Sequence, residues 1–115
     1  MAYLETLKPV RWRGASHAAM RELPGDARFE AGHELNRLQQ GLDPVNWKPM
    51  STIGPGVAEI RVYAGREYRV FYLARFAEAV YVLHVFEKKS RKTSGLDLEL
   101  GRVRYRQLVR ERSGQ

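Results

Sequence analysis

The fold is decided by residues 57–87, which read VAEIRVYAGREYRVFYLARFAEAVYVLHVFE. Three runs rich in valine, isoleucine, tyrosine and phenylalanine lie in this stretch, at Val57–Ala64, Glu67–Arg75 and Ala79–Glu87. These residue types favour strands, and too few residues separate the runs to form a crossover helix. We therefore predict three consecutive antiparallel strands, the first two joined by a tight hairpin turn at Gly65-Arg66.

The length of this hairpin loop decides which side chains share a face of the sheet. A two-residue loop at Gly65-Arg66 would pair Val62 with Arg69 and place Arg61 and Arg69 on opposite faces. A three-residue loop at residues 64–66 would pair Arg61 with Arg69 on one face. The sequence alone leaves both registers open.

The flanking sequence predicts a fourth strand and three helices. Lys8–Arg13 alternates apolar and basic residues after a proline, as a short edge strand does, whereas residues 41–56 hold three prolines and three glycines and indicate a loop. The predicted helices are one opened by Ser16 and stopped by Pro24-Gly25, a second over Ala27–Gln40 that Asp26 caps, and a last one opened by Ser94 or Asp97. This order indicates a single α+β domain over residues 1–115, with an antiparallel sheet of about four strands, two N-terminal helices and a C-terminal helix.

Composition narrows the class of protein. A chain of 115 residues has room for one modest core, and 43% hydrophobic with 29% charged residues is ordinary for a globular protein. The absence of cysteine excludes disulfides and thiolate chemistry. Residues 1–8 lack a basic segment followed by an apolar run, and no apolar stretch is long enough to span a bilayer, so we expect a cytoplasmic protein without a membrane partner. We expect neither a cofactor nor a metal.

The positive charge is concentrated near the end of the chain. Residues 1–87 contain eleven Lys and Arg against ten Asp and Glu, whereas residues 88–115 contain nine against three, out of a net charge of +7. Such a patch attracts a polyanion such as nucleic acid, or the acidic surface of a protein partner. A solvated basic tail is the alternative interpretation of the same charge.

Several short motifs occur in a specific order between residues 8 and 110. They follow the patterns E-(I/L)-R, Y-R-(V/L)-x-Y and F-x-K-K-(S/T)-x-K-T, and are found at Glu59-Ile60-Arg61, Tyr68-Arg69-Val70-Phe71-Tyr72 and Phe86–Thr93, with Trp47-Lys48-Pro49-Met50 ahead of them. In this order they resemble the phage-related, HigB-like branch of the RelE/HigB toxins of type II toxin–antitoxin systems. The resemblance implies a microbial RNase-like fold, ribosome-dependent cleavage of mRNA that inhibits translation, and neutralisation by a HigA-like helix-turn-helix antitoxin.

The resemblance also implies site residues. Arg69 matches the arginine of the Y-R-(V/L)-x-Y strand and would hold the scissile phosphate, since a guanidinium suits a phosphate although it is a poor base. The alternative role for Arg69 is a structural ion pair with Glu59 or Glu67. Lys88 and Lys89 match the basic pair after the last strand, and neighbouring residues there point to opposite faces, so we expect only one to address the site.

The remaining candidates are a histidine and further RNA contacts. His84 is the catalytic candidate with an ordinary pKa near 6.5, and a hydrogen-bonded sheet histidine is the alternative interpretation. Lys48, Arg61, Arg91 and Lys92 are candidate phosphate contacts. The candidate RNA-stacking residue is Tyr105, although its spacing from the lysines is longer than in RelE and core packing is the alternative.

No residue is an unambiguous general base, so a second function stays open. A non-catalytic binder with the same fold, such as a ParE-like gyrase poison, would share the strand motifs without cutting RNA. Cleavage of ribosome-bound mRNA and inhibition of DNA supercoiling would separate these two functions.

Overall fold

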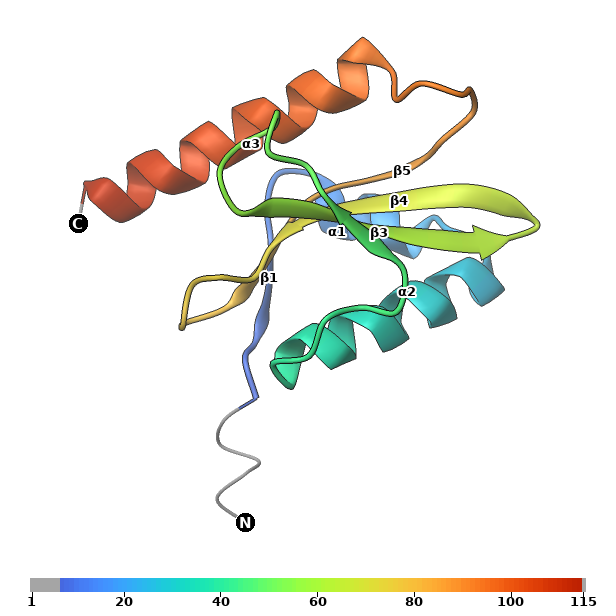
Figure 1. Cartoon of the computed structure of the whole chain (residues 1–115), viewed down its shortest axis with the longest axis horizontal. Coiled ribbons are helices and arrows are strands. Elements are labelled where there is room, and N and C mark those ends of the chain that lie inside the picture. Colours follow the sequence, from blue (N-terminus) through green and yellow to red (C-terminus); the bar gives the residue numbers. More distant parts are fainter. Residues whose placement is uncertain (1–6, 115) are drawn as a thin grey trace.

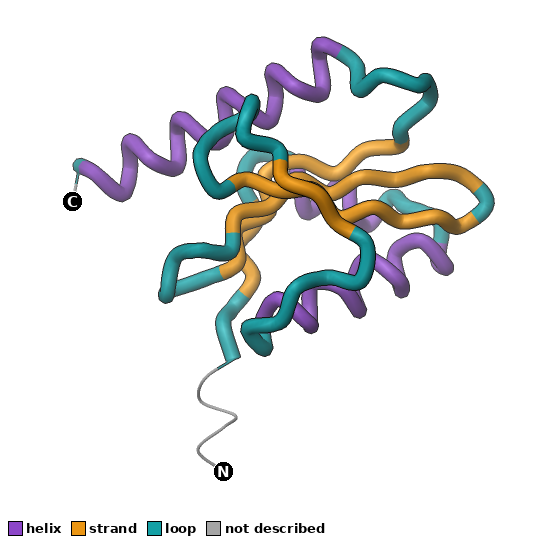
Figure 2. The backbone as a smooth tube through the Cα atoms, in the orientation of Figure 1, coloured by secondary structure: helices purple, strands orange, loops and turns teal. Residues whose placement is uncertain are grey.

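A five-stranded mixed sheet forms the centre of the structure, a computed structural model that describes residues 7–114 (Figures 1 and 2). The strands lie in the order β1-β5-β4-β3-β2. Their bounds are β1 Val10–Trp12, β2 Trp47–Pro49, β3 Val57–Ala64, β4 Arg66–Leu73 and β5 Val80–Glu87. The predicted meander of three antiparallel strands is confirmed as β3, β4 and β5.

Two short edge strands differ from the prediction of a purely antiparallel sheet of about four strands. Strand β1 was predicted, but it pairs with β5 in parallel. The two helices and three strands between them supply the long connection that a parallel pair needs. Strand β2 lies within the predicted loop 41–56 and pairs with β3, placing Lys48 opposite Glu59. Its three residues end on Pro49, which an edge strand tolerates because one side of it needs no partner.

The hairpin between β3 and β4 takes the register of the three-residue loop. Arg61 lies opposite Arg69, and Tyr63 lies opposite Glu67. Gly65 stands alone at the tip with φ +77°, a left-handed conformation that glycine adopts without a steric cost. Arg61 and Arg69 therefore share one face of the sheet.

A β-bulge changes the alternation of side chains in β5. His84 pairs with Phe71, whereas Val82 pairs with the next residue of β4, Tyr72, so Leu83 is the extra residue. Leu83 packs with the core beneath α3, and His84 contacts α3 as well. The bulge thus turns two successive side chains of β5 toward the same helix.

Three helices were predicted, and residues 7–114 contain three: α1 Ser16–Arg21, α2 Gly25–Gln39 and α3 Gly95–Ser113. Ser94 caps α3, since its hydroxyl accepts from the Asp97 N–H at 3.1 Å. The capping roles of Ser16 and Asp26 are wrong. Ser16 lies inside α1, where its buried hydroxyl donates to the carbonyl of Val82, and Asp26 lies inside the first turn of α2.

The helices cover the two faces of the sheet unequally (Figure 1). Helices α1 and α2 cover one face over a continuous apolar core. Helix α3 crosses the other face and packs on a second core that includes Phe71, Leu73, Leu83 and Leu108. The sheet residues near the β3–β4 hairpin on that second face are polar and lie outside this core. In the described part of the chain, no helix is long and apolar enough to cross a membrane.

Candidate functional site

The sheet face beside α3 is hollowed into a pocket of about 390 Å³. Strands β2, β3 and β4, the 88–93 loop and the start of α3 supply its lining. Six lining residues are cationic and only one is acidic. The full lining is Lys48, Met50, Thr52, Glu59, Arg61, Arg69, Lys88, Arg91, Lys92, Thr93 and Leu98, and we call this site the cationic pocket.

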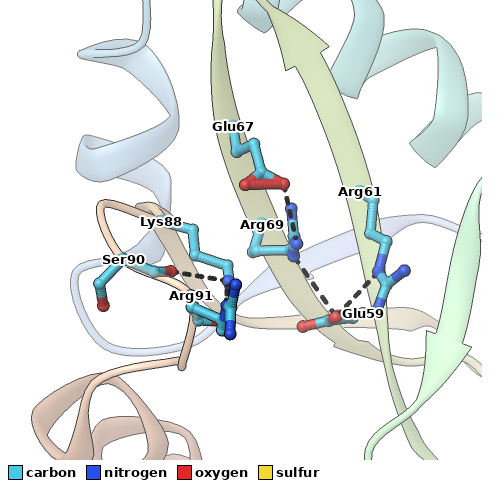
Figure 3. Close-up of polar contacts among 7 residues, drawn as sticks. All are labelled: Glu59, Arg61, Glu67, Arg69, Lys88, Ser90 and Arg91. Atoms are coloured by element: carbon cyan, nitrogen blue, oxygen red, sulfur yellow. Dashed lines mark hydrogen bonds and ion pairs between the residues drawn. The ribbon is translucent and has the colours of Figure 1, made fainter.

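Two arginines and two glutamates form a chain of ion pairs at the pocket floor (Figure 3). The Arg61 Nε donates to Glu59 Oε1 at 3.2 Å, and the Arg69 Nε lies 3.4 Å from the same oxygen. The Arg69 Nη2 donates to Glu67 Oε1 at 3.2 Å. Alternation along β3 and β4 places all four side chains on one face, once the hairpin register pairs Arg61 with Arg69. Arg69 thus has carboxylate partners, as the alternative interpretation of the sequence held.

The two central members of this ion-pair chain, Glu59 and Arg69, are buried, but their hydrogen bonding is incomplete. Arg69 and Glu59 are each 3% exposed. Within residues 7–114, no group accepts a hydrogen bond from Arg69 Nε or Nη1, and none donates to Glu59 Oε2. Buried polar groups are satisfied in the great majority of cases. Nε still has an ion pair with Glu59, whereas Nη1 has neither a hydrogen bond nor an ion pair among the described residues. An arginine with such a donor beneath a cationic pocket is therefore suited to an oxyanion, which would accept from it.

Glu67 is the member of this chain nearest to the β3–β4 hairpin. Desolvation raises its pKa, but hydrogen bonds from Arg69 and Tyr63, together with the charges of Arg69 and Lys88, outweigh that effect and lower the pKa below its usual value. Glu67 therefore remains a carboxylate at neutral pH and holds Arg69 from the side opposite Glu59.

Lys88 organises the loop that forms one wall of the pocket. The side-chain Nζ of Lys88 donates to the carbonyls of Ser90 and Arg91 at 2.7 and 2.6 Å, and its backbone N–H donates to the backbone carbonyl of Glu67 at 2.8 Å. Arg91 and Lys92, which follow, line the pocket. Lys89 is exposed and lines only an adjoining hollow, which shares Lys88 and Lys92 with the cationic pocket. The structure therefore brings only one of the two predicted lysines to the cationic pocket.

The predicted RNA contacts separate into two groups. Lys48, Arg61, Arg91 and Lys92 all line the cationic pocket with Arg69. Tyr105 does not, because its half-buried ring packs against the core beneath α3 and closely approaches Gly54.

His84 lies under α3 rather than in the cationic pocket. It is 7% exposed, its Nε2 lies 2.7 Å from Asp97 Oδ1, and its Nδ1 lies 3.3 Å from the Arg104 guanidinium. Burial lowers the pKa of His84, and the charge of Arg104 adds to this, against the opposing effect of Asp97. This is a hydrogen-bonded sheet histidine, neutral at pH 7.

Sequence reasoning missed two features of this region. Glu59 had been considered only as a structural partner of Arg69, although it is the one carboxylate that lines the pocket. The partners of His84 were not anticipated, because Asp97 and Arg104 lie 13 and 20 residues away on another element. The Glu59-Ile60-Arg61 spacing was a usable signal for the first, since residues two apart on a strand share a face.

Comparison with known proteins places the chain in a family. A search of curated proteins finds no match. A family model described as phage-derived protein Gp49-like matches residues 18–106, which include every strand from β2 onward and most of α3. This family is RelE-like and is associated with the toxins of toxin–antitoxin systems. The match spans most of the chain, and the chain therefore belongs to the phage-derived Gp49-like family of RelE-like toxins.

Proposed function

We propose that the protein is a ribosome-dependent endoribonuclease, a HigB-like mRNA interferase that cuts mRNA and thereby stops translation. The observation that carries this proposal is the cationic pocket, in which a buried arginine with unused N–H donors lies under five further cations. Such a concentration of positive charge suits the phosphate backbone of RNA. Membership in a family of toxins supports the same proposal.

The proposed reaction is attack of a ribose 2′-oxygen on the neighbouring phosphorus. A bond forms between the 2′-oxygen and phosphorus while the bond to the 5′-oxygen breaks, which leaves a cyclic phosphate and a 5′-hydroxyl. Negative charge accumulates on the phosphate oxygens in the transition state, so positioned cations accelerate the reaction. Arg69 is the central clamp in this proposal, and Arg61 and Arg91 flank it.

The reaction also needs a proton acceptor and a proton donor. Glu59 is the only carboxylate that lines the pocket, and its Oε2 has no hydrogen-bond donor within the described residues. We assign Glu59 as the acceptor of the 2′-hydroxyl proton. The ammonium groups of Lys48, Lys88 and Lys92 are the donors that the pocket offers to the leaving 5′-oxygen.

The ribosome and an antitoxin complete the proposal. Two of the three Lys88 ammonium hydrogens are engaged with the loop, and Arg69 is almost fully buried, so free RNA meets an incompletely presented site. We propose that the ribosome positions the mRNA there, and that a HigA-like helix-turn-helix antitoxin neutralises the toxin through an acidic segment drawn to the basic residues after 87.

The direct test measures cleavage of mRNA on purified ribosomes by primer extension, beside cleavage of the same RNA without ribosomes. We expect cuts only when ribosomes are present, and loss of these cuts in the Arg69→Lys variant. DNA supercoiling by gyrase is measured in parallel. Intact mRNA together with inhibited supercoiling would replace this proposal with the gyrase-poison function.

A further inference from the structure

A second hollow adjoins the cationic pocket across Arg61, which lines both. Its volume is about 360 Å³, within the range of roughly 300–1,000 Å³ typical of small-molecule sites. It is lined by Arg61 and Tyr63 of β3, by Val45 and Asn46 before β2, and by Glu30, His33 and Glu34 of α2. We call it the Tyr63 pocket.

Tyr63 gives this pocket an exposed aromatic wall. The residue is 52% exposed, although most other tyrosines of the sheet are buried. The Arg69 guanidinium lies 5.9 Å from the centre of its ring, within cation–π distance, and its side chain is hydrogen-bonded to Glu67. Tyr63 is thus held beside the ion-pair chain while much of its surface remains open.

The rest of the lining combines an apolar side chain with an unused acceptor. Val45 is 77% exposed and belongs to neither apolar core. Glu34 is 4% exposed, and its Oε2 accepts from the N–H groups of Val45 and Asn46 at 2.7 and 3.4 Å. Its Oε1 has no hydrogen-bond donor in residues 7–114. A ligand that stacks on a ring and donates a hydrogen bond matches these features.

We propose that the Tyr63 pocket binds a nucleobase of the RNA strand whose phosphate occupies the cationic pocket. Bases stack on exposed aromatic rings whatever their sequence, and the shared wall at Arg61 places such a base next to the phosphate site. The unused Glu34 oxygen favours a base with an exocyclic amino group, as in adenine, cytosine or guanine. This inference rests on the proposed function and assigns to Tyr63 the stacking role that sequence analysis gave to Tyr105.

The test uses the full chain and RNA that cannot be cut. The probes are a trinucleotide of 2′-O-methyl adenosine, which lacks the attacking hydroxyl, and the same trinucleotide with an abasic middle residue. Nitrogen-15 NMR titration gives both the affinity and the place of binding. We expect the amide signals of Val45, Asn46 and Tyr63 to move with the complete trinucleotide and to move less with the abasic one.

Three variants test the role of the ring. Tyr63→Ala should weaken binding of the complete trinucleotide about 5- to 100-fold, the scale of one lost stacking contact. It should also remove the difference between the two probes. Tyr63→Phe keeps the ring and should bind as the wild type does. Trp47→Ala is the matched control, because Trp47 is an exposed aromatic residue on the same sheet edge that lines neither pocket.

The outcomes separate this inference from the proposed function. Equal affinity for both probes, unmoved signals at Val45 and Tyr63, or unchanged binding by Tyr63→Ala would each overturn the base pocket, whether or not the protein cuts mRNA on ribosomes. Binding as expected without any ribosomal cleavage would keep the base pocket and overturn the endoribonuclease proposal. If both hold, Tyr63→Ala should also change which bases flank the cuts, whereas Tyr63→Phe should not.

Discussion

Replacing Arg69 with alanine tests the ion-pair chain and the proposed phosphate clamp together. The change removes a buried cation whose Nε lies 3.4 Å from Glu59 and whose Nη2 lies 3.2 Å from Glu67. Glu59, which is 3% exposed in the wild type, would keep Arg61 as its only ion-pair partner among the described residues. Because the structure gives Arg69 two carboxylate partners, we expect Arg69→Ala to be destabilised.

The expected loss of stability follows from the geometry. Removing one partner of a buried ion pair costs about 3–5 kcal/mol, since it leaves an uncompensated charge. Arg61 still contacts Glu59 at 3.2 Å, so we take the lower end, about 3 kcal/mol. For 115 residues, an unfolding entropy of about 2.1 cal/mol/K per residue corresponds to about 0.24 kcal/mol per degree. The melting temperature should thus fall by about 12 °C.

Calorimetry of purified Arg69→Ala and Arg66→Ala measures this loss against a matched control. Arg66 lies three residues earlier on the same strand and pairs with Glu87 at 3.4 Å, but its side chain is 70% exposed. Such a surface pair contributes about 0–1 kcal/mol, so its removal should lower the melting temperature by no more than about 4 °C. A similarly small shift for Arg69→Ala would refute our account of the buried pair.

The Arg69→Lys variant then separates stability from function. Lysine keeps a positive charge near Glu59 and should melt later than the alanine variant. It lacks the planar fork of donors that fits a phosphate, so we expect cleavage on ribosomes to fall by about 100-fold even when the protein is fully folded. Full activity of folded Arg69→Lys would make Arg69 a structural residue and would remove it from the proposed site.

Three further predictions concern the remaining candidates. Glu59→Gln should lower the rate of single-turnover cleavage by about 100-fold or more if Glu59 accepts the 2′-hydroxyl proton. Glu67→Gln, at the end of the ion-pair chain, should lower it less, and equal losses in the two variants would contradict the role of Glu59 as the proton acceptor. Lys88→Ala should reduce cleavage and Lys89→Ala should not, because only Lys88 lines the cationic pocket, and the same primer-extension assay compares them. Burial lowers the pKa of His84 in the folded state. The contribution of neutral His84 to stability is therefore fully present above the unfolded pKa of about 6.5 and is lost as the pH falls toward the folded pKa. Urea unfolding from about pH 8 to about pH 5 should show this fall in the free energy of unfolding in the wild type, and a smaller fall in His84→Gln.

The sequence predicted the meander well because its signals are local. Runs of β-branched and aromatic residues marked β3, β4 and β5 to within about two residues, and Ser94 was a correct cap because its hydroxyl reaches the third residue of the following helix. The cationic candidates were also found from sequence, since four of the predicted RNA contacts line one pocket with Arg69. Their assembly depends mainly on alternation along strands, which a sequence displays directly.

The features that sequence could not show depend on distant contacts. Strand β2 has only three residues in a segment rich in proline and glycine, and it exists because β3 offers an open edge to pair with. The hairpin register was undecided for a similar reason. Both the two-residue and the three-residue hairpin loop are compatible with Gly65-Arg66. The strand residues that must face each core decide between these two registers. The partners of His84 lie on α3, and no local sequence pattern shows that this helix packs over His84.

The bulge at Leu83 explains why one lysine and not its neighbour belongs to the site. On a regular strand, residues an even number apart share a face, so Tyr81, Leu83 and Val85 would all lie beneath α3. The extra residue shifts this alternation: Val85 instead packs in the core beneath α1 and α2, and Phe86 packs beneath α3. Phe86 pairs with Arg69, and Lys88 follows on the same side, where it lines the cationic pocket. Without the bulge, Lys89 would take this place, so a single inserted residue in the last strand selects the lysine that faces the buried arginine.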